Sequence, residues 1–150
     1  MPAVQSTYPT EIRSAVEGMV ADAGLKTIVS RTVETVAGVG FGLAVVQGTA
    51  DDGVIVPTAT GGVFRGITVR DVTLPQSSGD AYQQYDEAAL MISGVIWVTA
   101  QEAVSAGDPV SFEVTTGQLT TIVDATHDAI PNATWETSAG IGTLAKIRLR

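Results

Sequence analysis

The chain has 150 residues, a formal net charge of −8 and a sequence pI near 4.4. This charge argues against nucleic acid and against an anionic membrane as partners, because both attract basic surfaces. A hydrophobic content of 45% excludes a wholly disordered chain, and the length suits one domain with a substantial core.

The composition favours strands over helices. The chain contains 20 Val, 19 Thr and 10 Ile, and these β-branched side chains pack well on pleated surfaces. Strand signals recur about every 8–12 residues, with glycine-containing turns between them. We therefore predict an all-β fold, a single β-sandwich or barrel-like domain with an N-terminal arm.

Residues 1–24 differ from the rest of the chain and are predicted to form the arm, with the β-rich domain at 25–150. Pro2 and Pro9 interrupt this segment, and Ile12, Val16 and Met19 give only a weak helical pattern. An extended arm lying on another molecule and a short helix packed on its own domain both remain open. The segment has no signal-peptide pattern, and no apolar run approaches the length of a membrane span, so synthesis in the cytoplasm is expected.

The first half of the domain shows four extended segments separated by turns. Gly66 is a candidate β-bulge within the fourth segment. The polar stretch Pro75–Asp86 is predicted to be a surface loop that presents Tyr82 and Tyr85 as contact residues. The four predicted segments are Lys26–Val36, Leu43–Gln47, Val54–Val56 and Val63–Leu74.

The stretch Glu87–Val114 is predicted to organise the core. It contains two apolar runs, Ala88–Ile92 and Val95–Val98, and then a Gly-Asp-Pro turn that leads into Val110–Val114. Both faces of Val95–Val98 carry apolar side chains, which is typical of a strand buried on two sides. We place Val95, Trp97 and Val110 in the core and leave Trp135 open.

The remaining residues are predicted to add a hairpin, a loop and two strands. Gln118–Val123 pairs with Val110–Val114, Asp124–Ala133 is a loop, Thr134–Thr137 is a short strand, and Leu144–Leu149 is the last strand.

No pattern in the sequence supports catalysis, a cofactor or a metal ion. Gly38–Gly42 lacks the spacing of a phosphate-binding loop, and Asp51-Asp52-Gly53 lacks the spacing of a calcium loop. His127, the single histidine, could form a small metal site with Asp124 and Asp128, although a solvated acidic loop is the stronger interpretation. We therefore predict no catalytic, cofactor-binding or metal-binding residues, and no enzyme activity.

Two tryptophans and one sequon leave weaker alternatives. Trp97 and Trp135 could stack on a ligand, but core or interface positions are commoner for such side chains. Asn132-Ala133-Thr134 matches a glycosylation sequon, which matters only in a secreted eukaryotic protein.

Several segments, taken in order, resemble the structural cement or head decoration proteins of tailed bacteriophages. The resemblance spans about Gly18 to Leu149 and rests on GMVADAGLKTIVSRTVE, VFRGITVRDVTL, SGVIWVTAQEAVSAGDPVSF and TSAGIGTLAKIRL. It implies a non-enzymatic virion protein that binds the outside of an icosahedral capsid and stabilises it. The implied partners are the major capsid protein and further copies of itself, as a homodimer or homotrimer, with no nucleic acid and no membrane. It also implies synthesis in the host cytoplasm.

A carrier-type domain of the barrel-sandwich class is the alternative. The segment AVSAGDPV is similar to the tight turn of such domains, whose modified lysine should lie at an exposed hairpin tip. Lys26 and Lys146, the two lysines of the chain, both fall in predicted strands, which argues against this interpretation.

Overall fold

The structure of the protein is a computed structural model, which describes residue 10, residues 15–74 and residues 79–150. The described part of the chain is built of β-strands and contains no helix, as the composition predicts. In particular, none of its segments is a helix long and apolar enough to cross a bilayer. The strands are β1 (Thr27–Val33), β2 (Val39–Gly40), β3 (Ala44–Gln47), β4 (Gly53–Ile55), β5 (Phe64–Thr68), β6 (Ala81–Tyr82), β7 (Glu87–Thr99), β8 (Pro109–Glu113), β9 (Leu119–Thr120), β10 (His127–Trp135) and β11 (Leu144–Leu149).

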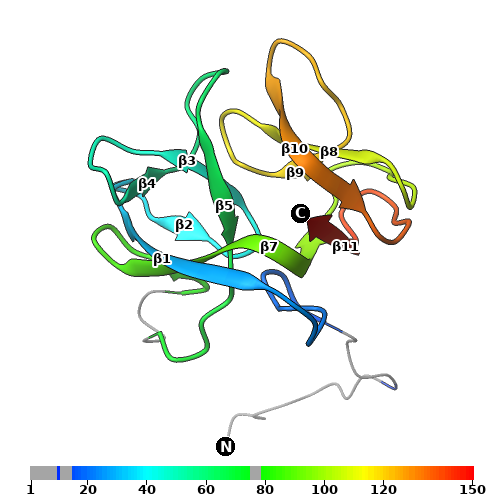
Figure 1. Ribbon diagram of the computed structural model, residues 1–150, viewed down its shortest axis with the longest axis horizontal. Helices are drawn as coiled ribbons and strands as arrows, with labels where there is room; N and C mark the ends of the chain where they lie inside the picture. Colours follow the sequence, from blue (N-terminus) through cyan, green and yellow to red (C-terminus); the bar gives the residue numbers. More distant parts are fainter. Residues whose placement is uncertain (1–9, 11–14, 75–78) are drawn as a thin grey trace, which may run out of the picture.

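The strands form two lobes that share β7 (Figure 1). The nine-stranded sheet has the order β1-β4-β3-β5-β7-β11-β10-β8-β9, and an extra pairing of β1 with β7 closes its first half into a small barrel. In the other half of the sheet, a parallel bridge joins Ala100, just after β7, to Leu119 in β9. This bridge connects the last strand of the sheet order back to β7, so the second half is also closed. The first lobe is therefore β1, β3, β4, β5 and the start of β7, and the second is the end of β7 with β8–β11. The short pair β2–β6 lies in the first lobe.

A bulge in β7 lets one strand serve both lobes. The register with β1 passes from Ile28↔Met91 to Thr27↔Ser93, so Ile92 is an extra residue on β7. The next glycine, Gly94, has φ 128°, and a Cβ there would lie 2.8 Å from Cβ of Lys26. The insertion reverses the alternation of side chains, so Met91 and Ile96, five residues apart, can both face the second core.

Two buried clusters lie on the two faces of β3 and β7. The cluster inside the first lobe comprises Val33, Val39, Phe41, Val45, Val54, Tyr82, Ala88 and Leu90. The larger cluster lies in the second lobe and continues between the lobes to Ala44, Val46, Ile67 and Met91. Val45 thus faces one core while its neighbours Ala44 and Val46 face the other, which is the alternation expected of a strand buried on both sides.

The predictions for most strands are confirmed, and several loop boundaries are corrected. Leu144–Leu149 is a strand with the predicted bounds, and the segment Val63–Leu74 is extended as a strand only over β5. A register shift beside Gly66, between Val45 and Val46 of the partner strand, confirms the bulge. The runs Ala88–Ile92 and Val95–Val98 belong to one 13-residue strand.

The prediction of a loop at Asp124–Ala133 is wrong, because β10 occupies most of this range. Its polar residues and Pro131 suggested a loop, but the register with β8 shifts between Ala129 and Thr134, and Asn132 has φ 57°. Proline is compatible with a strand at such a bulge, where no ladder hydrogen bond is needed from its nitrogen.

The prediction that Pro75–Asp86 is a structureless surface loop is also wrong over its described part. Ala81–Tyr82 forms β6, and the Tyr82 side chain is fully buried with its hydroxyl donating to the Val69 carbonyl at 2.6 Å. Tyr85 is exposed, as predicted. An amphipathic tyrosine can occupy either environment, so the polar neighbours of Tyr82 were a poor guide.

The prediction that Trp97 lies in the core is wrong, and Trp135, which the sequence left open, is the buried tryptophan. Trp135 is 1% exposed and lies in the second core, whereas Trp97 is only partly buried, with the Lys146 ammonium 5.4 Å from its ring centroid. Trp97 shares its strand face with Val95 on the outer side of the second lobe, while Ile96 and Val98 face the core. Val95 and Val110 are buried, as predicted.

Residues 15–21 lie along the edge of β7 that β11 leaves free. The Gly18 and Ala21 amides donate to the carbonyls of Trp97 and Val95, and the Trp97 amide donates to the Met19 carbonyl. Residues 1–9 and 11–14 of the predicted arm lie outside the described residues, and its boundary at residue 24 stays a prediction.

Candidate interaction surfaces

The residues of the hypothetical metal site are only partly brought together. The Asp124 carboxylate lies 2.8 Å from Nδ1 of His127 and also accepts hydrogen bonds from the amide and hydroxyl of Thr126. These contacts, that of His127 first, lower the pKa of Asp124 to about 2. Asp128 instead accepts the Gly61 amide at 2.8 Å, which ties β10 to the turn before β5. Within the described ranges, no three His, Asp or Glu side chains form a group that could hold a metal ion.

The two glycine motifs have structural roles. Gly38 has φ 76°, and a Cβ there would lie 2.2 Å from the Tyr82 carbonyl oxygen, so this glycine allows two backbones to touch. Gly53 lies against Glu34, whose carboxylate accepts the amides of Thr49 and Ala50 at 2.7 and 2.8 Å. The Thr49 amide is the main cause of a lowered pKa of Glu34. Sequence reasoning identified the turn at Asp51–Gly53 but missed the carboxylate that holds it.

The lysines do not fit the carrier interpretation. Lys146 lies within β11, over the Trp97 ring, and Lys26 directly precedes β1. A carrier lysine needs a free hairpin tip, whereas Lys146 lies inside a strand and Lys26 lies immediately before one. Asn132 of the sequon is exposed on β10.

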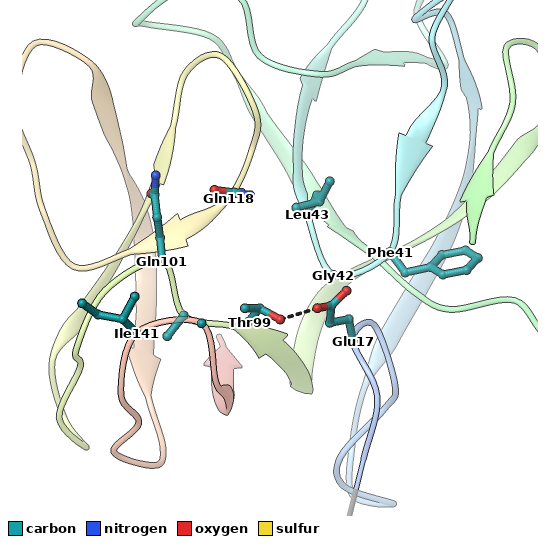
Figure 2. Close-up of a pocket in the computed structure, with 10 residues that line it drawn as sticks. Glu17, Phe41, Gly42, Leu43, Thr99, Gln101, Gln118 and Ile141 are labelled. Atoms are coloured by element: carbon teal, nitrogen blue, oxygen red, sulfur yellow. Dashed lines mark hydrogen bonds between the residues drawn. The ribbon is translucent and has the colours of Figure 1, made fainter. Parts of the chain in front are cut away.

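One hollow lies at the seam between the two lobes, and Figure 2 shows its lining. Phe41 and Leu43 come from the first lobe, and Gln101 and Ile141 from the second, around a volume of about 260 Å³. At one side, the Thr99 hydroxyl donates to the Glu17 carboxylate at 2.5 Å. The lining therefore offers both hydrogen bonds and apolar contacts.

A second hollow separates β5 from β10, and we call it the β5–β10 groove. Its walls are Gly62–Arg65 on one side and Ala129–Asn132 on the other, with Ile92, Phe112, Leu149 and Arg150 completing it, around about 470 Å³. The rings of Phe64 and Phe112 stack with their centroids 6.1 Å apart. No short motif marks this groove in the sequence, because its residues come from five separate segments.

Carboxylates gather beside the end of β1. The Asp52 and Asp86 carbonyls accept the amides of Thr32 and Val33, which places both acidic residues next to this strand. Glu87 accepts the Thr32 hydroxyl at 2.6 Å. We call Asp51, Asp52, Asp86 and Glu87 the acidic end of the first lobe.

Comparison with known proteins identifies the family. The model of the family described as structural cement protein (E217 gp24/Pam3 gp6) matches residues 4–150. The chain belongs to this structural cement protein family. It is therefore a phage virion structural protein with a capsid-stabilising role, and the resemblance seen in the sequence is confirmed.

One solved structure contains a chain with the same fold as this one. A chain in the structure titled "The capsid of Myoviridae Phage XM1" superposes with a TM-score of 0.81 at 19% identity, covering 99% of this chain and 98% of that one. A chain in "The crystal structure of head fiber gp8.5 N base in bacteriophage phi29" has a TM-score of 0.45 at 14% identity, covering 83% and 95%. No curated protein sequence matches the chain. The superposition with the XM1 chain confirms the all-β prediction.

Proposed function

We propose that this cement protein binds the outer surface of an assembled icosahedral shell as a homo-oligomer, with the major capsid protein as its partner. It acts without catalysis, nucleic acid or membrane, and is made in the host cytoplasm before it joins the virion. Binding to the assembled shell alone would stabilise that state by mass action.

The acidic end of the first lobe is the observation that carries the contact with the shell. Two of its residues, Asp51 and Asp52, are exposed at the turn between β3 and β4, in a chain of net charge −8. Tyr85, beside Asp86, is 74% exposed and has φ 71°, a conformation that large side chains rarely adopt. An exposed aromatic residue with a carboxylate rim suits a basic patch on a protein surface.

The predicted arm, residues 1–24, supplies a second part of this proposal. Its first residues carry Val4, Tyr8 and Ile12, which is more apolar surface than a free tail needs. Residues 15–21 already pair with β7 of their own domain, so we propose that residues 1–14 are the part that orders on contact with another subunit. Ordering would cost about 1–2 kcal/mol for each residue fixed, so the contact must be extensive.

Particle stability tests the function. Particles that lack the protein should rupture at a lower temperature than complete particles, and adding purified protein should restore the difference. A double charge reversal, Asp51→Lys with Asp52→Lys, should weaken binding to bare particles and reduce its dependence on salt, because surface ion pairs are screened. The matched control is Asp22→Lys, an exposed acidic position outside the acidic end. Equal rupture temperatures with and without the protein would remove the cementing role, and equal binding by both variants would remove this contact surface.

A further inference from the structure

The β5–β10 groove is a gap in the nine-stranded sheet. In the sheet order, β7 and β11 lie between β5 and β10, but β5 pairs with β7 only at Ile67 and Thr68. The ladder of β10 with β11 begins at Ala133, and Arg150 donates its amide to the Asn132 carbonyl. The preceding parts of both strands, 64–66 and 129–131, therefore face the groove with backbone edges that pair with no described strand. Figure 1 shows β5 in the first lobe and β10 in the second, and both strands line the groove.

The groove is apolar at its floor and basic at its rim. Ile130 and Leu149 are buried beside the stacked rings of Phe64 and Phe112, whereas Val63 is 63% exposed. The rim carries the side chains of Arg65 and Arg150, and the lining residues include no Asp or Glu. Unpaired strand edges above apolar side chains are the features by which a protein binds an extended peptide as an added strand.

A segment of this chain has the matching properties. Ala3–Tyr8 lies between Pro2 and Pro9, so six consecutive residues can donate backbone hydrogen bonds. In extended form, Val4 and Tyr8 point to the same side, where they could cover the apolar floor. The segment carries no charged side chain, so its insertion beside two arginines brings no like-charge repulsion.

The path of the chain points to a second copy. The bridge of Val20 with Ile96 is antiparallel, so the backbone traced from Ala21 back to Gly18 moves towards Thr99. Ala15 lies near Thr99 and Leu144, whereas the groove lies at the other end of β11, at Leu149. These ends are about 17 Å apart at the rise of a strand. The seven residues from Tyr8 to Ala15 could span at most about 25 Å, so insertion into the same copy would use most of that length and require the chain to reverse its direction beyond Ala15, whereas insertion into a neighbouring copy requires no such reversal.

We propose that the β5–β10 groove of one copy receives Ala3–Tyr8 of a second copy as an added β-strand. This inference rests on the self-association in the proposed function and names the contact that produces it.

Cross-linking between different copies tests the inference, and the absence of native cysteine makes the chemistry specific. The full chain is made as Ser6→Cys, isotopically labelled, and separately as Val63→Cys; the two are mixed and oxidised with copper–phenanthroline. Ser6→Cys preserves Val4 and Tyr8. The control partner is Val36→Cys, because Val36 is also a highly exposed valine but lies at the end of the first lobe. Mass spectrometry should find a disulfide between positions 6 and 63 of differently labelled chains, and far less between positions 6 and 36.

A second measurement keeps the test independent of the disulfide. A maleimide should label Val63→Cys several-fold more slowly than Val36→Cys in the free oligomer, and deletion of residues 1–14 should abolish this difference. A link between positions 6 and 63 within one chain would overturn the second-copy assignment. Protection of position 63 only on particles would assign the groove to the shell instead. An oligomer that binds particles but gives no cross-link would overturn this inference alone, whereas a monomer that fails to bind would overturn the proposed function as well.

Discussion

The two lobes are stabilised in different ways although they share β7. The first lobe has very short strands, such as the two-residue β2 and β6, and many of its backbone groups are satisfied by side chains. Glu34 holds the turn after β3, the Thr68 hydroxyl donates to the Gly40 carbonyl, and Tyr82 donates to Val69. The second lobe also has a two-residue strand, β9, and side-chain bonds to its backbone from Ser111 and Thr137. It differs in its nine-residue β10, which lies between β8 and β11, and in a larger apolar core around Trp135 and Phe112.

This difference follows from the need to satisfy every buried backbone group. A long ladder satisfies amides and carbonyls by itself, so the second lobe can use its inward positions for apolar side chains. A lobe made of short strands and turns has fewer ladder bonds, and therefore requires polar side chains at defined places. We expect the second lobe to be sensitive to loss of volume and the first to loss of single hydrogen bonds.

The largest effect should come from the second core. Trp135→Ala should lower the free energy of unfolding by roughly 3–5 kcal/mol, the range for large core truncations. Trp97→Ala should cost only about 1–2 kcal/mol, because its ring is partly exposed beneath Lys146. Urea unfolding followed by circular dichroism measures both. If both variants lost the same free energy of unfolding, the outer face of β7 would contribute as much to stability as the second core.

The contact between the lobes should be the next most sensitive. Gly117 has φ 74°, and a Cβ there would lie 2.3 Å from the Ala44 carbonyl oxygen of β3. Gly117→Ala should therefore destabilise the protein by about 1–3 kcal/mol more than the conformational cost alone, because the two backbones must separate. Gly142→Ala is the control, since Gly142 has φ 70° and no atom within 4 Å of the added Cβ. Similar unfolding midpoints for both variants would mean that the lobes can move apart freely.

A single hydrogen bond tests the first lobe. Tyr82→Phe should cost about 1–3 kcal/mol, because the buried Val69 carbonyl loses its donor. Tyr85→Phe, on an exposed side chain, should change stability by less than about 0.5 kcal/mol. Burial raises the pKa of Tyr82, so the stability from its neutral form is present below about pH 10 and is lost as the pH rises further. Urea unfolding at pH 8 and pH 11 should show a smaller alkaline loss for Tyr82→Phe than for the native chain.

The smallest effect should come from the exposed turn before β10. The pKa of Asp124 is lowered to about 2, so its stabilising contribution is present above the ordinary aspartate range near pH 4 and is lost as the pH falls through about 2. Asp124→Asn should slightly lower stability at pH 7 and reduce the loss between pH 7 and pH 3. The comparison is Asp51→Asn at another exposed turn, measured by urea midpoints at both values. An unchanged acid slope in Asp124→Asn would show that the contact with His127 does not stabilise the fold.

The sequence by itself determined the all-β class, most strand positions and the absence of a recognisable catalytic motif. These follow from local properties: β-branched residues favour pleated strands, and glycine, aspartate and proline mark turns wherever they occur. The last strand, Leu144–Leu149, was predicted to the residue because its alternation and the preceding turn agree.

Only the tertiary structure decided which face of a strand is buried and which distant segments meet. Trp97 and Trp135 both lie in apolar strand sequences, but the bulge at Ile92 and the partner strands determine which one enters the core. The polar segments β10 and β6 are strands because β8 and β2 lie beside them and pair with their backbones. Tyr82 is buried because its ring packs in the first core beside Phe41, where its hydroxyl donates to the Val69 carbonyl. The β5–β10 groove lies where the pairing of β5 with β7 and the pairing of β10 with β11 stop. These limits depend on strand register, which no local sequence pattern encodes.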